Sequence, residues 1–361
     1  MADIITQETR VKKRCISQLQ IAKALNVNQS TVSFALRGSP NVSNLTKQKV
    51  LELCKKYNYR PNYFSRNLRS PCNSVIGLVI PPLHDAYFAR LLHFLIARLR
   101  EFNYDVMIRT VTDRANKKEG ILELLDQRVG GVLVMGAVHP EVCGEVQDIL
   151  GNSIPLVIVG ATAEGVSCVS TNKFNGALQA GRHLVSIGRR RLAIMVGHSI
   201  SITGSDNKIA GFSQACLEAN LSAPICLGPT LNQTNSETLL LGYQLGNLLL
   251  DNHSDIDGIL CASDGYATSM VCACIERGIR VPEDIAIIGF DDTPESRFTA
   301  IPLTTVQQPI QEIARIATNM LLSEIKSFPS FVPETTILDC NLIIRKSTNP
   351  LWKPEQEQVS T

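Results

Sequence analysis

The residues best suited to a chemical role in this 361-residue chain form a polar group near its N-terminus. Gln29, Ser30, Thr31 and Ser33 lie within five consecutive positions. A glutamine forms paired hydrogen bonds with adenine, and serine or threonine hydroxyls bond to base edges or phosphate oxygens. The chemistry that this group favours is the reading of nucleic acid.

The charge of the surrounding segment favours the same kind of partner. Residues 1–70 contain 13 Lys and Arg against 3 Asp and Glu, whereas residues 71–361 contain 22 against 30. A small basic segment attached to a larger acidic one suggests a polyanion as the partner of the basic segment. A solvated basic tail would have the same composition, so charge alone leaves both interpretations open.

The sequence carries no pattern typical of an enzyme or of a metal site. It contains no GxGxxG, GxxxxGK(S/T), HExxH or GxSxG motif. The six histidines lack metal-ligand spacing, and the eleven cysteines include no CxxC pair. Asp291 and Asp292 are adjacent in sequence, so we do not expect them to converge on one substrate. We therefore expect no enzymatic activity, no cofactor and no metal.

Apolar segments long enough for a membrane are also missing from the sequence. The longest apolar runs are far shorter than the roughly 20 residues that cross a bilayer. The first 14 residues are polar and charged, unlike a secretory signal. Irregularly spaced cysteines do not indicate a disulfide framework. We expect a cytoplasmic protein with no membrane partner.

Three short helices are expected to position the polar group. Ser17 is a good N-cap for a first helix, and Asn28 for a second helix that runs to about Leu36. Ser43 precedes a third helix at about 46–57. A tight turn between the first two helices predicts a helix-turn-helix unit, which presents the N-terminal part of its second helix to the major groove of DNA.

A resemblance to a known family lies in the string TVSFALRG and in the VS, KV and NYRPN that follow it. Together they resemble the DNA-binding headpiece of the LacI/GalR family of bacterial transcription regulators. The resemblance continues at GRHLVSIGRRRLAIMVG, IAGF, CASDGYA and VPEDIAIIGFDDTPESRFTAIPLTTVQQP, and it covers about residues 16–346. It implies a homodimeric regulator, most often a repressor, whose affinity for a pseudo-palindromic operator depends on a small-molecule effector.

Carbohydrates are the usual effectors in this family, so a sugar is the expected ligand. A nucleobase, a phosphosugar or no ligand at all are the alternatives within the family. A solute-binding protein or an enzyme has much less support.

The resemblance also implies which residues contact DNA. Residues 62–71 correspond to a hinge helix, in which Leu68 matches a leucine that wedges between bases in the central minor groove. Phe34 stands where the family often has Arg, so it either contacts a thymine methyl group or packs inward. The expected DNA-binding residues are Gln29, Ser30, Thr31, Ser33, Phe34, Arg37, Asn41, Tyr59, Asn62 and Leu68.

From Ser74 onward, strand-like runs alternate with helix-length stretches. This alternation predicts parallel sheets with helices on both faces, and ligands in such folds bind at the carboxyl ends of the strands. The resemblance implies a periplasmic-binding-protein architecture, in which the chain crosses between two lobes near residues 172, 290 and 320. The expected strands span 75–80, 105–110, 131–135, 156–159, 192–196, 258–261 and 285–289.

The predicted fold is a small all-α helix-turn-helix domain followed by an α/β two-lobed domain with parallel sheets. The expected segments are a disordered basic arm (1–15), the headpiece (16–61), the hinge (62–71), an effector-binding and dimerisation domain (72–346) and a tail (347–361). Lobe 1 is expected at about 72–171 and 290–319, and lobe 2 at about 172–289 and 320–346. The tail has no leucine heptads, so we expect dimers rather than coiled-coil tetramers.

The resemblance places the effector site at the strand ends of the second domain. Asp291 is the first carboxylate of GFDDT, and two carboxylate oxygens suit vicinal hydroxyl groups. Lys208 stands where relatives usually carry an effector-binding Arg, and Asn172 where they usually carry Asp. The expected effector-binding residues are Tyr87, Phe88, Asn172, Lys208, Ser263, Asp264 and Asp291.

Overall fold

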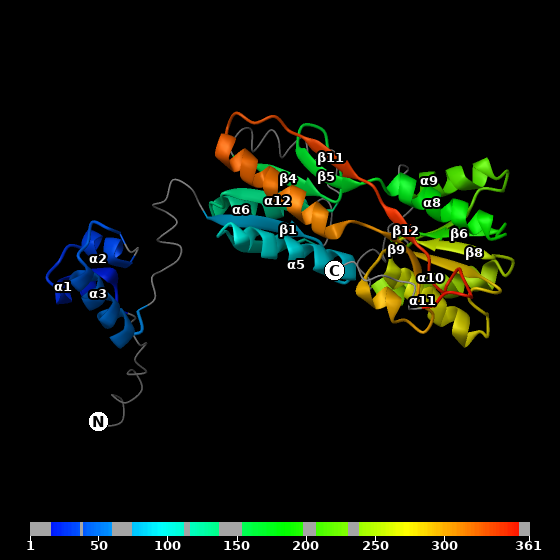
Figure 1. The fold of residues 1–361 in the computed structure, drawn as a ribbon, viewed down its shortest axis with the longest axis horizontal. Coiled ribbons are helices and arrows are strands. Elements are labelled where there is room, and N and C mark those ends of the chain that lie inside the picture. Colours follow the sequence, from blue (N-terminus) through cyan, green and yellow to red (C-terminus); the bar gives the residue numbers. More distant parts are fainter. Residues whose placement is uncertain are drawn as a thin grey trace, which may run out of the picture. The chain divides into compact units, whose positions relative to one another are not determined.

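The computed structural model describes residues 16–36, 39–59, 74–111, 116–136, 154–197, 207–229 and 238–353. The chain forms two compact units, residues 1–73 and 74–361, and each has its own apolar core (Figure 1). The expected arm (1–15) and hinge (62–71) lie outside the described residues. Within the described ranges, no helix is both long enough and apolar enough to cross a membrane.

The first unit is built from three helices, as the sequence predicts. They are α1 (Gln18–Ala24), α2 (Gln29–Leu36) and α3 (Asn44–Lys56). Ile21 from α1, Val32 from α2 and Val50 from α3 are fully buried against one another. One apolar side chain from each helix therefore anchors the predicted helix-turn-helix unit, which is confirmed.

Two serines begin the helices where the sequence places them. The Ser17 hydroxyl accepts a hydrogen bond from the Gln20 amide at 3.3 Å, and the Gln20 side chain accepts one from the Ser17 amide at 2.8 Å. This reciprocal pair is a capping box, which satisfies amides that a helix leaves unpaired. Ser43 caps α3 through a single bond of this kind, because its hydroxyl accepts from the Thr46 amide at 3.2 Å.

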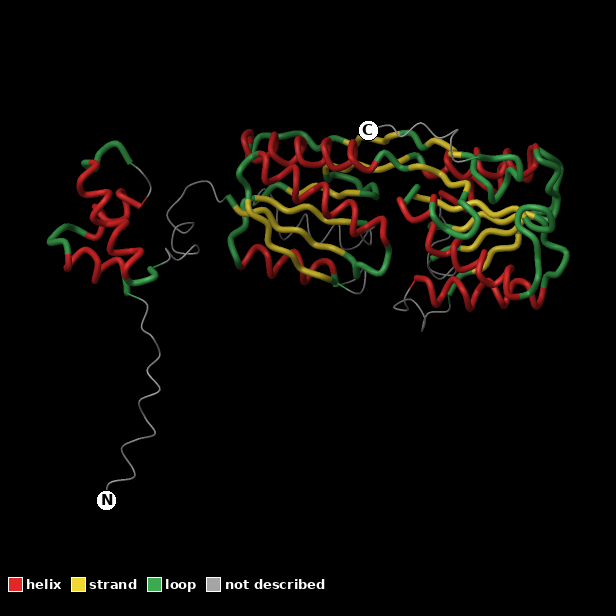
Figure 2. The backbone as a smooth tube through the Cα atoms, turned by 60° about the horizontal axis from the view of Figure 1, so that its bottom comes forward, coloured by secondary structure: helices red, strands yellow, loops and turns green. Residues whose placement is uncertain are grey.

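The second unit contains two six-stranded sheets. Sheet A has the strand order β11-β5-β4-β3-β1-β2, and sheet B has the order β12-β10-β9-β8-β6-β7. All neighbouring strands are parallel except β12, which runs antiparallel to β10. Figure 2 shows the strands of both sheets lying between helices. The predicted α/β architecture with parallel sheets is confirmed.

The strands of sheet A are β1 (Val75–Ile80), β2 (Asp105–Thr110), β3 (Gly131–Met135), β4 (Leu156–Val159), β5 (Ser167–Thr171) and β11 (Thr335–Leu338). The strands of sheet B are β6 (Leu192–Met195), β7 (Ile225–Leu227), β8 (Gly258–Cys261), β9 (Ala286–Asp291), β10 (Thr304–Gln307) and β12 (Asn341–Ile343). The helices are α5 (Ala86–Glu101), α6 (Lys117–Asp126), α8 (Lys173–Ser186), α9 (Asn207–Glu218), α10 (Thr238–Asn252), α11 (Asp264–Glu276), α12 (Ile310–Ser327) and the 3₁₀ helix η2 (Pro294–Arg297).

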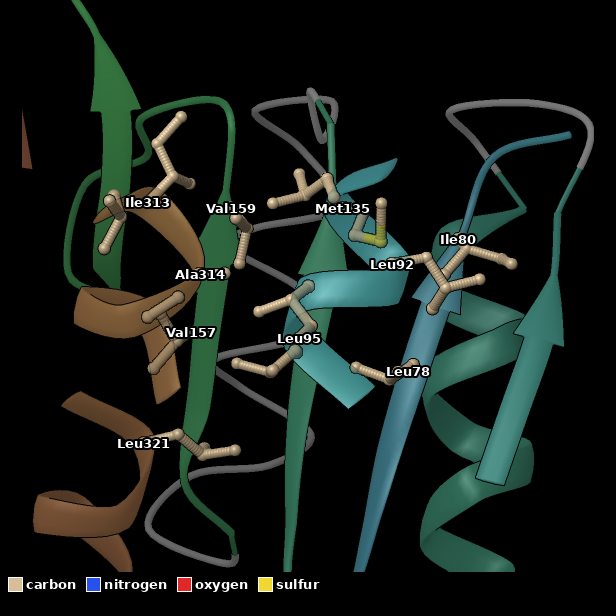
Figure 3. Packing of buried hydrophobic residues seen from close by; sticks show 14 of the residues in the cluster. Leu78, Ile80, Leu92, Leu95, Met135, Val157, Val159, Ile313, Ala314 and Leu321 are labelled. Atoms are coloured by element: carbon tan, nitrogen blue, oxygen red, sulfur yellow. The ribbon is translucent and has the colours of Figure 1, made fainter. Parts of the chain in front are cut away.

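Sheet A is covered by helices on both faces. Leu78 and Ile80 of β1 pack in one apolar cluster with residues of α5 and α12, and Figure 3 shows Leu95 of α5 in this cluster. Gly77, on the opposite face of β1, lies against the side chain of Leu124 in α6. This alternation follows from the two-residue period of a strand. We call sheet A with α5, α6 and α12 lobe A.

Sheet B is covered in the same way. Ile287 of β9 packs with the residues of α10 and α11, whereas its neighbour Ile288 packs with those of α8 and α9. Both side chains are fully buried. A central strand with two buried faces reads as a continuous apolar run, which is typical of parallel sheets. We call sheet B with α8–α11 lobe B.

The chain crosses between the lobes at positions that differ in part from the expected ones. The first crossing joins β5 to α8 near residue 172, where the sequence predicts it. The second lies between β10 and α12 near residue 308, and the third between β11 and β12 near residue 340. The crossings expected near 290 and 320 are therefore wrong, because β10 pairs with β9 in sheet B and α12 packs against α5 in lobe A.

The end of the second domain also lies further along the chain than residue 346. The Ser347 hydroxyl donates to the Ile287 carbonyl and accepts from the Thr304 amide at 2.8 Å. Ser347 and Thr348 are buried. The segment around residue 347 is thus part of lobe B, and the boundary predicted between 346 and 347 is wrong.

The close approach of α8 and α9 gives a test of this packing. A Cβ atom on Gly211 of α9 would lie 2.1 Å from the Phe174 carbonyl oxygen, which belongs to the main chain of α8 and cannot move aside. We expect Gly211→Ala to lower the free energy of unfolding by about 1–3 kcal/mol or more. Chemical denaturation of the full-length protein measures the change.

The matched control is Gly246→Ala in α10. Its added methyl group would meet the sulfur of Met270 at 3.1 Å, and this flexible side chain can shift. Alanine also has the higher helix propensity, by about 1 kcal/mol. Equal destabilisation by the two substitutions would contradict the packing described for α8 and α9.

Candidate DNA-binding and ligand-binding sites

The polar residues predicted to read DNA lie together on one face of α2. Gln29 and Ser33 are four residues apart, as are Ser30 and Phe34, so the four side chains are neighbours on the helix. Phe34 is 40% exposed. Phe34 is not among the side chains that form the core of the first unit, and its contact with a thymine methyl group stays a prediction.

The remaining predicted DNA-binding residues have different environments. Thr31 is half-buried on α2, and Asn41 is exposed in the turn before α3. Tyr59 packs against the core of the first unit, where burial raises the pKa of its hydroxyl group. Arg37, Asn62 and Leu68 lie outside the described residues.

Helix α3 adds positive charge to this unit. Lys49, Lys55 and Lys56 are exposed, and Lys47 is partly exposed. The only acidic residue on this helix is Glu52. An excess of ammonium groups attracts phosphates without regard to sequence.

In the second unit, Tyr87 and Phe88 lie at the carboxyl ends of β3 and β4. The Tyr87 hydroxyl lies near Gly160, which follows β4, and the Phe88 ring lies near Gly136, which follows β3. The two rings meet edge to face, with 5.3 Å between centroids. The Tyr87 side chain is 7% exposed, and its hydroxyl has no hydrogen-bond partner among the described residues.

Asp291 lies at the carboxyl end of β9 and is almost completely buried. Its carboxylate accepts a hydrogen bond from Gln308 Nε2 at 2.6 Å. Burial, together with the negative charge of Asp85, raises the pKa of Asp291 well above its usual value. Its φ of 112° is in a region that disfavours any residue with a side chain, and such strain is concentrated at functional sites.

Lys208, at the start of α9, lies near the same carboxylate. Its ammonium group donates to the Ala262 carbonyl at 2.7 Å and lies 3.9 Å from the centre of the Phe290 ring. Its positive charge acts on both Asp291 and Asp85. Lys208 therefore serves as a counter-charge inside the group of acidic residues.

Ser263 and Asp264 begin α11 at the end of β8. The Ser263 hydroxyl caps the helix by accepting from the Tyr266 amide at 3.5 Å. Asp264 is 2% exposed, and its two oxygens accept from the Thr305 hydroxyl at 2.5 Å and the Thr293 amide at 2.7 Å. Burial raises the pKa of Asp264 to about 7. Through its bond to the Thr293 amide, Asp264 fixes the position of the loop after β9.

Asn172 lies in the first crossing between the lobes. Its side-chain oxygen caps α8 by accepting from the Asn175 amide at 3.0 Å. Its main-chain amide donates to the Leu338 carbonyl at 2.7 Å, beside the third crossing. These bonds give Asn172 a structural role in the link between the lobes.

Two residues in this site are absent from the sequence-based prediction. Asp85 caps α5 by accepting from the Tyr87 amide at 2.9 Å, and the Ser263 side chain lies close enough to its carboxylate to favour the ionised form. Gln308 bonds to Asp291 and to the Thr171 hydroxyl, the latter at 2.6 Å. An Asp before a helix is an N-cap signal that could have indicated Asp85, whereas no local pattern indicates Gln308.

The arrangement combines aromatic faces, buried carboxylates and one ammonium group where the strands of both sheets end. Carboxylate oxygens accept hydrogen bonds from hydroxyl or amine groups, and ring faces suit a flat or ring-shaped ligand. In the described parts of the chain, no three His, Cys, Asp or Glu residues gather as a metal site. The site is therefore suited to a polar organic molecule rich in hydrogen-bond donors.

The unpaired hydroxyl of Tyr87 gives a test of this site. A buried polar group without a partner costs about 1–3 kcal/mol. We expect Tyr87→Phe to leave the free energy of unfolding of the ligand-free protein unchanged, or to raise it by about 1 kcal/mol. Thermal or chemical denaturation measures the sign of this change.

Tyr243→Phe is the control, since the Tyr243 hydroxyl donates to Glu276 on the protein surface. Loss of that bond is expected to lower the free energy of unfolding slightly, because water competes for a bond on the surface. If Tyr87→Phe destabilises the protein as much as Tyr243→Phe, the Tyr87 hydroxyl is already satisfied.

Comparison with known proteins assigns both units. Residues 19–62 match the family described as "Bacterial regulatory proteins, lacI family", and residues 182–348 match "Periplasmic binding protein-like domain". The HTH-type transcriptional repressor PurR of Haemophilus influenzae (strain PittEE) is 30% identical over 338 residues, which are 92% of this chain and 98% of that protein.

Solved structures share the fold. The lac repressor dimer bound to operator and the anti-inducer ONPF aligns with a TM-score of 0.78 at 22% identity, over 92% of this chain and 99% of that one. A LacI family transcriptional regulator from Enterococcus faecium with bound ribose aligns with a TM-score of 0.66 at 25% identity, over 77% and 99% of the two chains. Because the match to the H. influenzae relative extends over nearly all of that protein at 30% identity, this chain belongs to the lacI family of bacterial regulatory proteins.

Proposed function

We propose that this chain is a cytoplasmic transcriptional repressor that binds a pseudo-palindromic operator as a homodimer. The observation that carries the proposal is the exposed face of α2, which presents Gln29, Ser30, Ser33 and Phe34 from a basic three-helix unit. The relative matched over nearly its full length is named a transcriptional repressor, and the lac repressor was solved as a dimer on its operator. Two-fold symmetry makes a pseudo-palindromic site the geometric expectation.

The proposed contacts follow from side-chain chemistry. Gln29 reads adenine, and Ser30 and Ser33 bond to base edges or phosphates. Phe34 contacts the methyl group of a thymine, because it is exposed on the same face. The lysines of α3 supply the attraction to phosphates. By resemblance, Arg37, Asn41, Tyr59 and Asn62 add further contacts, and Leu68 wedges into the central minor groove from the hinge at 62–71.

The proposed regulator of DNA affinity is a small molecule that binds among Tyr87, Phe88, Lys208, Ser263 and Asp291. A sugar suits this group. The aromatic rings can pack against the apolar face of a sugar ring. The carboxylate can accept hydrogen bonds from two neighbouring hydroxyl groups. The related regulator from E. faecium was solved with ribose. Asn172 and Asp264 stabilise the site rather than contact the ligand, because their side-chain oxygens accept hydrogen bonds from other residues of the protein.

A non-sugar ligand, such as a nucleobase or a phosphosugar, or a regulator with no ligand, is the second candidate. The observation that favours it is the position of Lys208, which donates to the Ala262 carbonyl and lies against Phe290. A lysine held in this way does not provide the two-pronged contact of the arginine that relatives usually carry there.

Selection of binding sites from a random DNA library tests the proposed operator binding. The full-length wild-type protein is expected to enrich a two-fold symmetric sequence with an adenine and a thymine in each half-site. Phe34→Arg is expected to replace the thymine preference with guanine, because arginine forms paired hydrogen bonds with that base. Sequencing of the enriched pools measures the change.

Leu68→Ala is the complementary variant. Loss of the wedge should lower affinity for the enriched sequence while leaving the weak, salt-sensitive binding to unrelated DNA nearly unchanged. No enrichment of any sequence by the wild type would refute operator binding, and an unchanged preference in Phe34→Arg would remove Phe34 from the interface.

A thermal-shift screen against sugars, sugar acids, phosphosugars and nucleobases tests the proposed ligand. A ligand at about 100 times its Kd stabilises the native state by about 2.7 kcal/mol. In a protein of this size the expected shift in Tm is about 2–4 °C. A shift confined to one sugar supports the proposal, whereas shifts only with another class, or with none, favour the second candidate.

A further inference from the structure

Helix α5 contacts the other lobe through its first two turns. Arg90 lies on α5 in lobe A, and its Nη1 donates to the main-chain carbonyl of Asp292 in lobe B at 3.0 Å. The two residues are 202 positions apart in the sequence. Neither residue belongs to one of the three crossings, so this bond is a non-covalent link between the lobes.

The acceptor of this bond is held rigidly within lobe B. The Asp292 carboxylate accepts from Arg345 Nη2 at 2.6 Å and from Gln307 Nε2 at 2.7 Å. Its amide donates to the Thr305 hydroxyl at 3.3 Å. A carbonyl on a residue fixed in this way cannot follow Arg90 if lobe A moves, so separation of the lobes would break the bond.

The N-terminus of α5 makes a second contact with lobe B. Asp85 caps α5 and Ser263 caps α11, and the Ser263 side chain lies close enough to the Asp85 carboxylate to favour its ionised form. Lys208 of lobe B lies close enough for its charge to act on the same carboxylate. Burial raises the pKa of Asp85, whereas the Tyr87 amide, the charge of Lys208 and Ser263 favour its ionised form.

Arg90 therefore joins the lobes through a hydrogen bond, and the Asp85 carboxylate at the start of the same helix lies close to polar groups of lobe B. We infer that Arg90 forms an interlobe clasp that holds α5 of lobe A against the loop after β9 of lobe B, with the group around Asp85 as a second, electrostatic link. The ligand that we propose above would then change DNA affinity by strengthening or displacing the clasp, a step that rests on the proposed function. A ligand shifts such an equilibrium only by its difference in affinity for the two states.

Hydrogen–deuterium exchange of the full-length protein, without ligand or DNA, tests the clasp. In Arg90→Met the side chain keeps its length but loses its donors. Exchange is expected to become about tenfold faster in peptides that cover residues 84–92 of lobe A and 290–297 of lobe B. Loss of one hydrogen bond from a charged donor accounts for a factor of this size.

Arg98→Met is the matched control, because Arg98 lies on the same helix but pairs with Glu101 within lobe A. It should leave both peptides unchanged. Faster exchange in the α5 peptide alone, or in neither peptide, would overturn the clasp. If Arg90→Met does not fold by circular dichroism, Arg90→Lys, whose ammonium reaches less far, is judged by the same criteria. The experiment uses neither operator nor effector, so its failure is distinct from a failure of the proposed regulation.

Discussion

The structure of the second unit depends on one buried ion pair, between Arg345 and Asp292. Arg345 is completely buried, and it donates to the Asp292 carboxylate, to the Leu303 carbonyl at 2.9 Å and to the Ser296 hydroxyl at 3.1 Å. A buried guanidinium group without such partners would cost several kcal/mol. The C-terminal segment must therefore fold back onto sheet B, and the loop after β9 has a fixed conformation.

That loop connects the proposed ligand site to the segments that link the lobes. Asp291 and Asp292 both have positive φ angles, 112° and 50°, so the main chain leaves the extended conformation of β9 at these two residues. The Asp291 carboxylate meets Gln308 at the second crossing, and the Asp292 carbonyl meets Arg90 of lobe A. Gln308 in turn accepts from Thr171 at the end of β5. A ligand that contacts Asp291 would thus act on a residue bonded to the segments that link the lobes.

Local patterns in the sequence predicted much of this fold. The strands at 75–80, 105–110, 131–135, 156–159 and 258–261 have the predicted bounds, because each is a run of apolar or alternating residues. Ser17 caps α1 as predicted, and Ser43 precedes α3 as predicted, although α3 begins two residues earlier than expected. The predicted positions of the second and third crossings are wrong, because an amphipathic helix such as α12 has the same spacing of apolar residues in either lobe. Contacts between distant segments could not be predicted either, because nothing local indicates that Arg345 is buried or that Asp85 faces Ser263.

The candidate DNA-binding face on α2 was predictable because it rests on helical spacing alone, whereas the candidate ligand site depends on contacts between distant segments.

We propose that ligand binding in the second unit and DNA binding by the first are coupled. The most direct test measures the Kd of the full-length protein for its selected operator with and without a saturating ligand, and the Kd for that ligand with and without operator. We predict that each changes by the same factor, of about 5 to 150, since coupling free energies are reciprocal. If the Kd for the operator stays the same when the ligand is bound, the two binding events are not coupled.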